Sequence, residues 1–177
     1  MIDKDEERTG NNYSKANAFA PSTRIINGYG DTLNLSGPEL AIYRFYKAFN
    51  EKDITTMAKV WANTEDITAE NPAGGIRRGW SDLKWVYDKV LGLPAKVRAE
   101  FYDYTIHEAG DVFWSVGREC IFLNLSGEDT TLNVRITRIF RMIDGIWRLV
   151  HLHGSFEDPD MLLRYQQATE SSGSVKK

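Results

Sequence analysis

Two arginines stand in otherwise apolar strand patterns, and they are the residues of this sequence best suited to binding chemistry. Residues 112–122 place Arg118 in one predicted apolar row, and residues 132–142 place Arg138 near the middle of another. A guanidinium on such a face must pair with a carboxylate, a ligand anion or a subunit partner, because burying it unpaired is costly. We therefore predict a concave pocket in which both arginines receive the carboxylate of a small organic acid.

A structural explanation of the same two arginines stays open beside the functional one. Either guanidinium could form an internal ion pair instead of meeting a ligand. The carboxylates available for such a pair are Asp66, Glu70 and Glu119. Alternatively, a β-bulge could turn one arginine toward solvent.

The sequence also offers residues that could move a proton. His151 and His153 alternate along a predicted strand, so both rings should lie on one side of it. Such a pair can hold a metal when a third ligand is near, but we favour hydrogen-bonded histidines and expect no metal and no cofactor. If the protein is an enzyme, Glu70 or His151 is the predicted base, and Arg138 is the electrostatic clamp.

Aromatic side chains are expected to line the pocket as well as the core. The predicted ligand-binding residues beside the arginines are Tyr46, Trp61, Tyr87, Trp114 and His153. No phosphate-binding, nucleophile-elbow or zinc-protease motif occurs in the sequence. The single cysteine, Cys120, is expected to be a small buried thiol.

The elements that must position these residues fall into two groups. A capping box formed by Ser36 and Glu39 opens a predicted helix that runs to about residue 50, and Asp53 and Ser81 cap two further helices. A short strand is expected at residues 67–71. After Pro94 the hydrophobic period changes to two, which predicts four long strands at 97–107, 112–124, 130–143 and 146–155.

This order predicts an α+β fold. Long antiparallel strands must twist and curl, and a curled sheet closed on its concave face by helices forms a cone with a cavity. Asp158 and Pro159 are expected to start a last short helix that contains Tyr165. We expect a domain at residues 36–169, a polar tail at 1–35 that is flexible or laid over the surface, and a flexible tail at 170–177.

Composition excludes several classes of protein. The chain has 177 residues, of which 42% are hydrophobic and 27% charged, and its net charge is −3. These values exclude a wholly disordered chain and a coiled coil, and they give no basic field for nucleic acid or an acidic membrane. No secretory signal and no apolar run of about 18 residues occurs, so we expect a cytoplasmic protein.

The last two predicted strands resemble the signature of nuclear transport factor 2-like domains. The pattern is T-R followed by two apolar residues at 137–140, and then D-G-x-W-R, two apolar residues and H-x-H-x-S at 144–155. The likeness is greatest to the SnoaL-like branch that includes the calcium/calmodulin-dependent kinase II association (hub) domain. Residues 48–53 and Glu70-Asn71-Pro72 also match, and the resemblance extends from about Pro38 to Gln167.

The resemblance implies a cystatin-like cone and a homodimer that packs through the outer faces of its sheets, with a higher ring as a further option. In the hub branch, arginines line a deep cavity; Arg138 falls on such a position, and Arg118 lies two residues from its counterpart. Ketosteroid isomerases of this fold carry an acid where Asn71 stands and a tyrosine near Phe45, so that reaction is not expected.

Two functions follow as expectations. The first is a binding protein for a small organic acid, or an assembly module. The second is an isomerase, cyclase or dehydratase that acts on a polyketide-like or aromatic ring.

Overall fold

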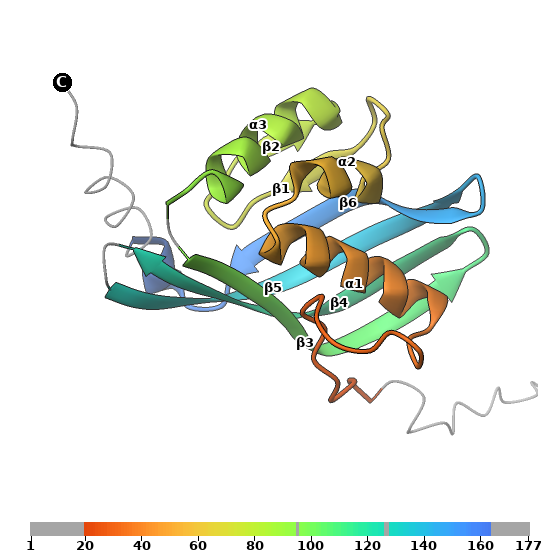
Figure 1. Ribbon diagram of the computed structural model, residues 1–177, viewed down its shortest axis with the longest axis horizontal. Coiled ribbons are helices and arrows are strands. Elements are labelled where there is room, and N and C mark those ends of the chain that lie inside the picture. The colour runs from red at the N-terminus through yellow and green to blue at the C-terminus, as the bar shows by residue number, and fades with distance from the viewer. Residues whose placement is uncertain (1–19, 95, 126–127, 164–177) are drawn as a thin grey trace, which may run out of the picture.

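The computed structural model describes residues 20–94, 96–125 and 128–163. In these ranges the chain forms helices on one side of a long curled sheet (Figure 1). The elements, in chain order, are α1 (Gly37–Asn50), α2 (Ile54–Val60), β1 (Thr68–Glu70), β2 (Ile76–Arg78), α3 (Gly79–Leu91), β3 (Lys96–Ala109), β4 (Val112–Leu125), β5 (Glu128–Ile143) and β6 (Ile146–Phe156). The predicted α+β class is confirmed, and β2 is an element that the sequence pattern did not predict.

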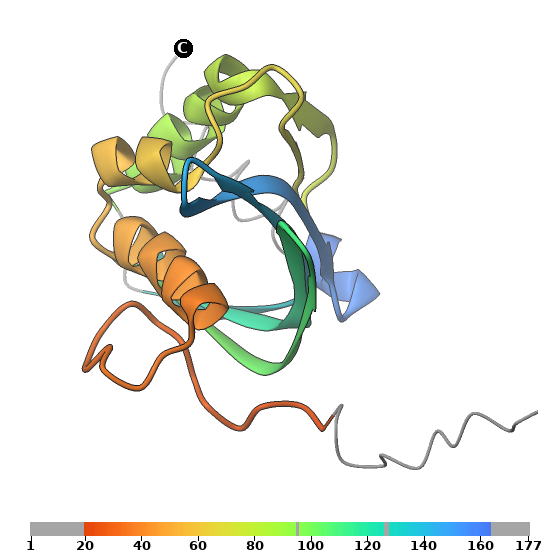
Figure 2. The same cartoon turned by 90° about the vertical axis from the view of Figure 1, so that its right-hand side faces the viewer.

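The sheet has the strand order β2-β1-β6-β5-β4-β3. Strands β3 to β6 form an antiparallel meander, while β1 pairs parallel to β6 and carries β2 on its other side. Seen end-on, the sheet curls around α1 in the way that long antiparallel strands require (Figure 2). The concave inner face of the sheet and the helices therefore enclose the core.

Local sequence signals explain where the helices begin. Ser36 and Glu39 form the expected capping box at α1, and the Asp53 carboxylate accepts hydrogen bonds from the first backbone N–H groups of α2. Helix α3 begins at Gly79, two residues before the predicted cap, and its preceding residue Arg78 makes no side-chain cap. Gly79 has a φ of 70°, a conformation that glycine adopts without strain, and it turns the chain directly from β2 into the helix.

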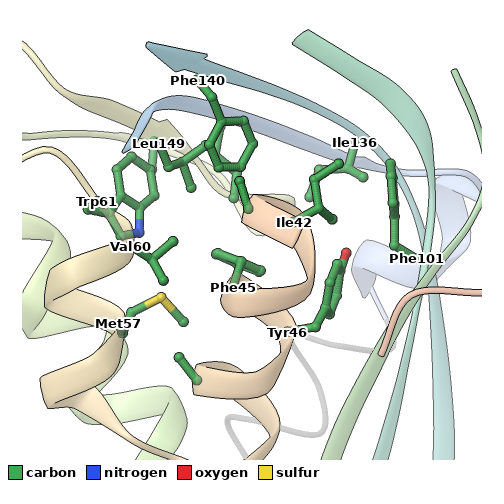
Figure 3. Packing of buried hydrophobic residues seen from close by; sticks show 14 of the residues in the cluster. Ile42, Phe45, Tyr46, Met57, Val60, Trp61, Phe101, Ile136, Phe140 and Leu149 are labelled. Carbon is green, nitrogen blue, oxygen red and sulfur yellow. The ribbon is translucent and has the colours of Figure 1, made fainter. Parts of the chain in front are cut away.

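The core lies between α1, α2 and the inner face of the sheet. Ile42 and Phe45 from α1 meet Phe140 and Leu149 from the sheet, and all four side chains are buried (Figure 3). This contact between helix and sheet follows from the apolar stripe of α1 and the alternating apolar residues of the long strands.

Residues 20–35, here called the N-terminal strap, are laid over the domain. Ser22 and Ile26 form bridges to Tyr104 and Phe101 of β3, and Ile26 is only 2% exposed. Gly28 approaches α1 so closely that a Cβ atom there would lie 2.2 Å from the backbone nitrogen of Lys47. These contacts attach residues 20–35 to β3 and α1, and the domain boundary at residue 36 stays a prediction.

A short helical segment follows β6. Residues 159–163 are helical, as expected after Asp158, whereas Tyr165 and the predicted tail at 170–177 lie outside the described residues. Within the ranges that the structure describes, no helix is long and apolar enough to cross a membrane.

Candidate functional site

Arg138 lies on the inner face of β5 and is completely buried. Its guanidinium carbon lies 4.7 Å, 4.9 Å and 5.0 Å from the ring centroids of Phe45, Tyr46 and Phe101 respectively. Cation–π attraction stabilises a guanidinium in such surroundings. A permanent positive charge thus stands inside the hydrophobic core.

Glu119 of β4 and Tyr46 of α1 partner this charge. The Nη2 atom of Arg138 donates to the Glu119 carboxylate and also, at 2.5 Å, to the Tyr46 hydroxyl oxygen. The Tyr46 hydroxyl in turn donates to Glu119 Oε2 at 2.5 Å. The internal ion pair with Glu119, which the sequence left open as an alternative for Arg138, is therefore present. We call Arg138, Glu119, Tyr46 and Ser115 the inner polar cluster.

Several polar atoms of the inner polar cluster have no hydrogen-bond partner among the described residues. They are Nε and Nη1 of Arg138 and the Oγ atom of Ser115, and all three are buried. Ser115 lies directly opposite Arg138 in the ladder between β4 and β5. Buried polar groups in native proteins are nearly always hydrogen-bonded, so these three atoms stand out as buried polar groups that the described residues leave unsatisfied.

Burial and charge fix the protonation of Tyr46 and Arg138. Burial raises the pKa of Tyr46 well above its ordinary value, so the phenol is neutral at physiological pH. Burial also acts to lower the pKa of Arg138, but the nearby Tyr46 and Glu119 more than offset this effect and the pKa is raised. Arg138 is therefore a cation that donates hydrogen bonds and cannot accept them.

Trp61 and Tyr87 form a second polar contact next to the cluster. The indole Nε1 atom of Trp61 donates to the Tyr87 hydroxyl at 3.1 Å. Burial raises the pKa of Tyr87, and the charges of Arg138 and Glu119 also act on it. The structure thus brings together four of the predicted site residues, namely Arg138, Tyr46, Trp61 and Tyr87.

Arg118 is not among them, and the prediction that it shares the inner face with Arg138 is wrong. Its side chain is half-exposed on the outer face of β4, where it pairs with Asp103 at 3.4 Å and with Glu157 at 2.8 Å. The ladder pairs Arg138 with Ser115. Because directly paired residues lie on the same face, Arg138 shares its face with the odd-numbered residues of β4.

Trp114 lies on the same outer face as Arg118. It is 36% exposed and stacks on His107 of β3, with ring centroids 5.2 Å apart. Its predicted place in the pocket is wrong for the same reason, because Trp114 also has an even number in β4.

The predicted bases lie on the outer face as well. His151 Nδ1 is 2.7 Å from the Thr68 hydroxyl, and His153 Nδ1 lies 2.8 Å from the Glu70 carboxylate. A register shift between Ile139 and Phe140 turns this end of β6 over. Without the bulge, His151 would stand opposite Arg138; with it, Leu152 does, and both histidines point away from the core.

Ser115 was not predicted for the site at all, and Glu119 was considered only as an ion-pair partner and not as a site residue. The hairpin between β4 and β5 could have revealed their face in the sequence. When the hairpin loop has two or four residues, the register pairs Arg138 with an odd-numbered residue of β4. The odd-numbered row reads Phe113, Ser115, Gly117, Glu119 and is the more polar of the two. Gly117 belongs to the packing of this row, since a Cβ atom there would lie 2.6 Å from Tyr104 Cβ.

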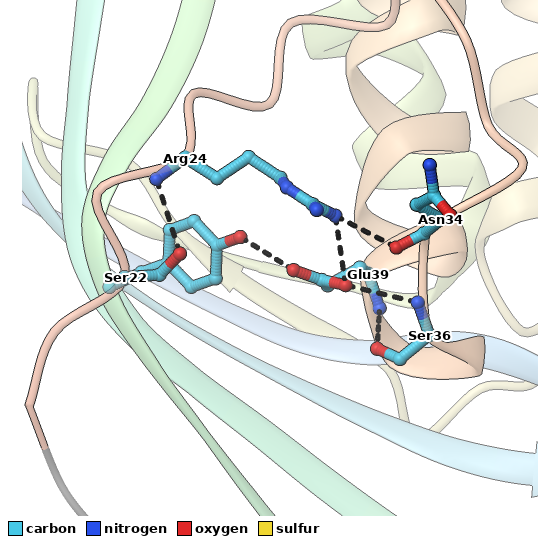
Figure 4. Close-up of polar contacts among 6 residues, drawn as sticks. Ser22, Arg24, Asn34, Ser36 and Glu39 are labelled. Atoms are coloured by element: carbon cyan, nitrogen blue, oxygen red, sulfur yellow. Dashed lines mark hydrogen bonds and ion pairs between the residues drawn. The ribbon is translucent and has the colours of Figure 1, made fainter. Parts of the chain in front are cut away.

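Two surface pockets lie beside the N-terminal strap. One, of about 260 Å³, is lined by strap residues and Tyr43; the other, of about 290 Å³, is lined by Ser22, Glu39 and Tyr104 among others. In the second, Glu39 accepts hydrogen bonds from Tyr104 and Ser36 and pairs with Arg24 (Figure 4). Glu39 is thus already paired, whereas buried donors of the inner polar cluster have no partner among the described residues, so we take the cluster as the better candidate for a ligand site.

Comparisons with known proteins show which family the chain matches. A family model described as a SnoaL-like domain matches residues 39–159. No curated protein matches the chain.

Solved structures give the same fold at low identity. A candidate dehydratase of the nuclear transport factor 2-like family from Streptomyces avermitilis aligns with a TM-score of 0.63 and 20% identity, over 68% of this chain and 93% of that one. A protein with a cystatin-like fold from Caulobacter vibrioides gives a TM-score of 0.58 and 17% identity, over 72% and 92% of the two chains. The calcium/calmodulin-dependent kinase II hub of S. rosetta aligns with a TM-score of 0.59 and 19% identity, over 68% of this chain and 94% of that one.

The family match covers the helices that close the cone and all four long strands, including both strands of the inner polar cluster. The chain therefore belongs to the SnoaL-like domain family and has the nuclear transport factor 2-like fold.

Proposed function

We propose that this chain binds a small organic molecule inside the cone, and that an oxygen atom of the ligand accepts hydrogen bonds from Arg138. One observation carries the proposal: Nε and Nη1 of a completely buried guanidinium have no partner among the described residues. The Ser115 hydroxyl, also unpartnered, supplies a further donor next to them. A ligand oxygen at this point would satisfy groups whose burial otherwise costs about 1–3 kcal/mol each.

Native mass spectrometry of protein purified without added ligand tests the proposal. We expect the wild-type chain to retain a small molecule, and the double variant Arg138→Met/Glu119→Met to lose it. The double substitution removes both charges together, so it leaves no unpaired buried charge and should fold. Arg118→Met, on the outer face, is the matched control and should retain the ligand.

The outcomes separate clearly. A small molecule held equally by the wild type and the double variant would show that Arg138 does not bind it. A wild-type chain that carries no small molecule and takes up none from a set of small acids, amides and ketones would also contradict the proposal. Thermal unfolding of each variant shows whether a lost ligand reflects a lost fold.

A second candidate is a proton-transfer enzyme, and Glu119 favours it. This carboxylate is 8% exposed, lies inside the cone and accepts a hydrogen bond from Tyr46. Glu70 and His151, the predicted bases, lie on the outer face and away from Arg138. Glu119 is the carboxylate that could act as a base on a molecule held by Arg138. Once a ligand is identified, Glu119→Gln should bind it and fail to turn it over; unchanged turnover would exclude this role.

Self-association is proposed for the outer face of the sheet. Trp114 and Val116 are partly exposed there, at 36% and 45%, and Trp114 is paired with the apolar Ile139 on the neighbouring strand. Exposed apolar side chains on a broad sheet face suit a contact with a second copy of this chain. The assembly role of the hub-like relatives is thus a proposal here and is independent of the inner polar cluster.

A further inference from the structure

The charge balance of the inner polar cluster defines the class of ligand that it can take. This step rests on the proposed function. Arg138 contributes one positive charge, and Glu119 contributes one negative charge that is hydrogen-bonded to it. A carboxylate ligand would therefore meet a pair that is already neutral, and it would add one uncompensated negative charge to a buried apolar site.

Among the described residues around Arg138 and Glu119, no second cation could compensate such a charge. Tyr46 from α1 and Tyr87 from α3 are the titratable groups that face the pair from the helices, and both are neutral phenols at physiological pH. The adjoining strand β6 contributes Leu152, which does not titrate, and β3 contributes Phe101 and Tyr104. Burial raises the pKa of Tyr104 to about 12, so this phenol is neutral as well. Cys120 follows Glu119 on β4, and burial raises the pKa of its thiol, so it also stays neutral.

We propose that the inner polar cluster binds ligands through an uncharged oxygen, such as that of an amide, ketone or ester, and that it binds an organic acid only together with one proton. The donors are the Nε and Nη1 atoms of Arg138 and the Ser115 hydroxyl. When an acid enters, the proton comes from solvent and resides on the ligand carboxyl group or on Glu119, so that the cluster keeps its total charge.

Acetamide and acetate test this inference, because they have nearly the same shape and differ in charge. Their binding can be followed through the NMR resonance of the Arg138 Nε–H group, which is assigned by its absence from the Arg138→Met/Glu119→Met variant. We expect the Kd of acetamide to stay constant between about pH 6 and about pH 8. The apparent Kd of acetate should rise about tenfold per pH unit, or about 100-fold over this range, because one proton is bound with it.

The variant Glu119→Gln removes the negative charge of the cluster and keeps a side chain of nearly the same shape. In this variant Arg138 has no buried counterion, so acetate should bind as an anion, with a Kd that is nearly independent of pH and lower than that of the wild type at pH 8. Glu100→Gln removes a carboxylate from the outer face of β3 and should behave like the wild type. The acetamide series also controls for any other group of the protein whose charge changes in this pH range.

Two results overturn the inference, and they differ in what they leave standing. If acetate binds the wild type at Arg138 with a pH-independent Kd, the proton linkage is wrong and the proposed binding site remains. If neither probe perturbs the Arg138 resonance in the wild type or in Glu119→Gln, the proposed function itself fails.

Discussion

The buried ion pair of Arg138 and Glu119 is tolerated in the core, but it need not stabilise the folded state. Removing both ions from water costs several kcal/mol, and their mutual attraction does not reliably repay that cost. Two nitrogen atoms of the guanidinium are also left without partners in the described structure. A pair of hydrophobic side chains of similar size would fill the same space without these costs, which is why we assign the pair to function.

Stability measurements can test this explanation. Arg138→Met alone should lower the free energy of unfolding by about 3–5 kcal/mol, because it leaves Glu119 charged and buried without its partner. The double variant Arg138→Met/Glu119→Met should recover the wild-type value or exceed it. Urea unfolding of the three proteins measures both differences, and a double variant as unstable as the single one would mean that the pair holds the fold together.

Gly117 gives a second prediction at the same scale. An added Cβ atom would lie 2.6 Å from Tyr104 Cβ and 2.8 Å from Phe101 Cε2. We therefore expect Gly117→Ala to lower the free energy of unfolding by about 1–3 kcal/mol through overpacking. Gly37→Ala is the control, since its new Cβ would lie 3.5 Å from the nearest atom, in ordinary contact. Equal stability of the two variants would contradict the close packing at Gly117.

The site residues were predictable to different degrees. Arg138 and Tyr46 follow from apolar periodicity, because each lies on the buried side of its element. Arg118 was misplaced because the row of β4 that faces outward is the more apolar of the two. A prediction from amino-acid type alone therefore places this row, with Arg118, on the inner face. Only the pairing of the two strands resolves this, through the rule that opposite residues share a face.

Among the elements, the bulge in β6 has the largest effect on the site. It moves His151 and His153 to the outer face, and it places Leu152 opposite Arg138. Nothing in the H-x-H pattern reveals it, because a bulge inserts one residue without a composition signal of its own. The strands themselves were predictable to within a few residues, since their apolar alternation and the Asp144-Gly145 turn are strong local signals.

Helix α1 depends on Glu39, which joins the capping box to the N-terminal strap. Its carboxylate accepts from the Ser36 backbone N–H and from the Tyr104 hydroxyl, and it pairs with Arg24. Partial burial acts to raise the pKa of Glu39, but these hydrogen bonds and the charge of Arg24 outweigh it, so the pKa is lowered below 4.5. The folded state therefore gains stability from ionised Glu39 above the unfolded pKa and loses it as the pH falls through the folded pKa.

Glu39→Gln should accordingly lower the free energy of unfolding by about 1 kcal/mol at neutral pH. The difference from the wild type should shrink below about pH 4.5, where the wild-type carboxyl group is protonated as well. Glu51→Gln, which removes a surface ion pair with Lys47, is the control and should change stability little. A difference between wild type and Glu39→Gln that is the same at both pH values would show that the carboxylate charge does not contribute.

For the molecule as a whole, the sequence predicted the class and the curl of the sheet, because both follow from strand length and hydrophobic period. It did not predict how residues 20–35 pack. This segment is polar and has no period, so its attachment depends on single contacts such as those of Ile26 and Gly28, which no local pattern reveals. The oligomeric state is likewise a property of surfaces and stays a prediction.

We expect a homodimer that is formed through the outer face of the sheet. Val116→Glu should weaken it, because it places a charge in the centre of the proposed contact. Leu33→Glu is the control, because Leu33 is highly exposed on the N-terminal strap and belongs to none of the strands of the sheet. Sedimentation velocity reports the result, and a wild-type monomer, or a Val116→Glu protein of unchanged mass, would contradict this contact.

The N-terminal strap has a consequence for solubility. β3 is the last strand of the sheet and is 14 residues long, so its outward N–H and C=O groups could template the addition of a foreign strand. Ser22 and Ile26 pair with two residues of this edge, Tyr104 and Phe101. Asp103, with a φ of 48°, breaks the regular strand geometry of β3 between Tyr102 and Thr105. The opposite edge, β2, has only three residues. The N-terminal strap thus covers part of the longer edge of the sheet and leaves fewer of its backbone groups open to a foreign strand.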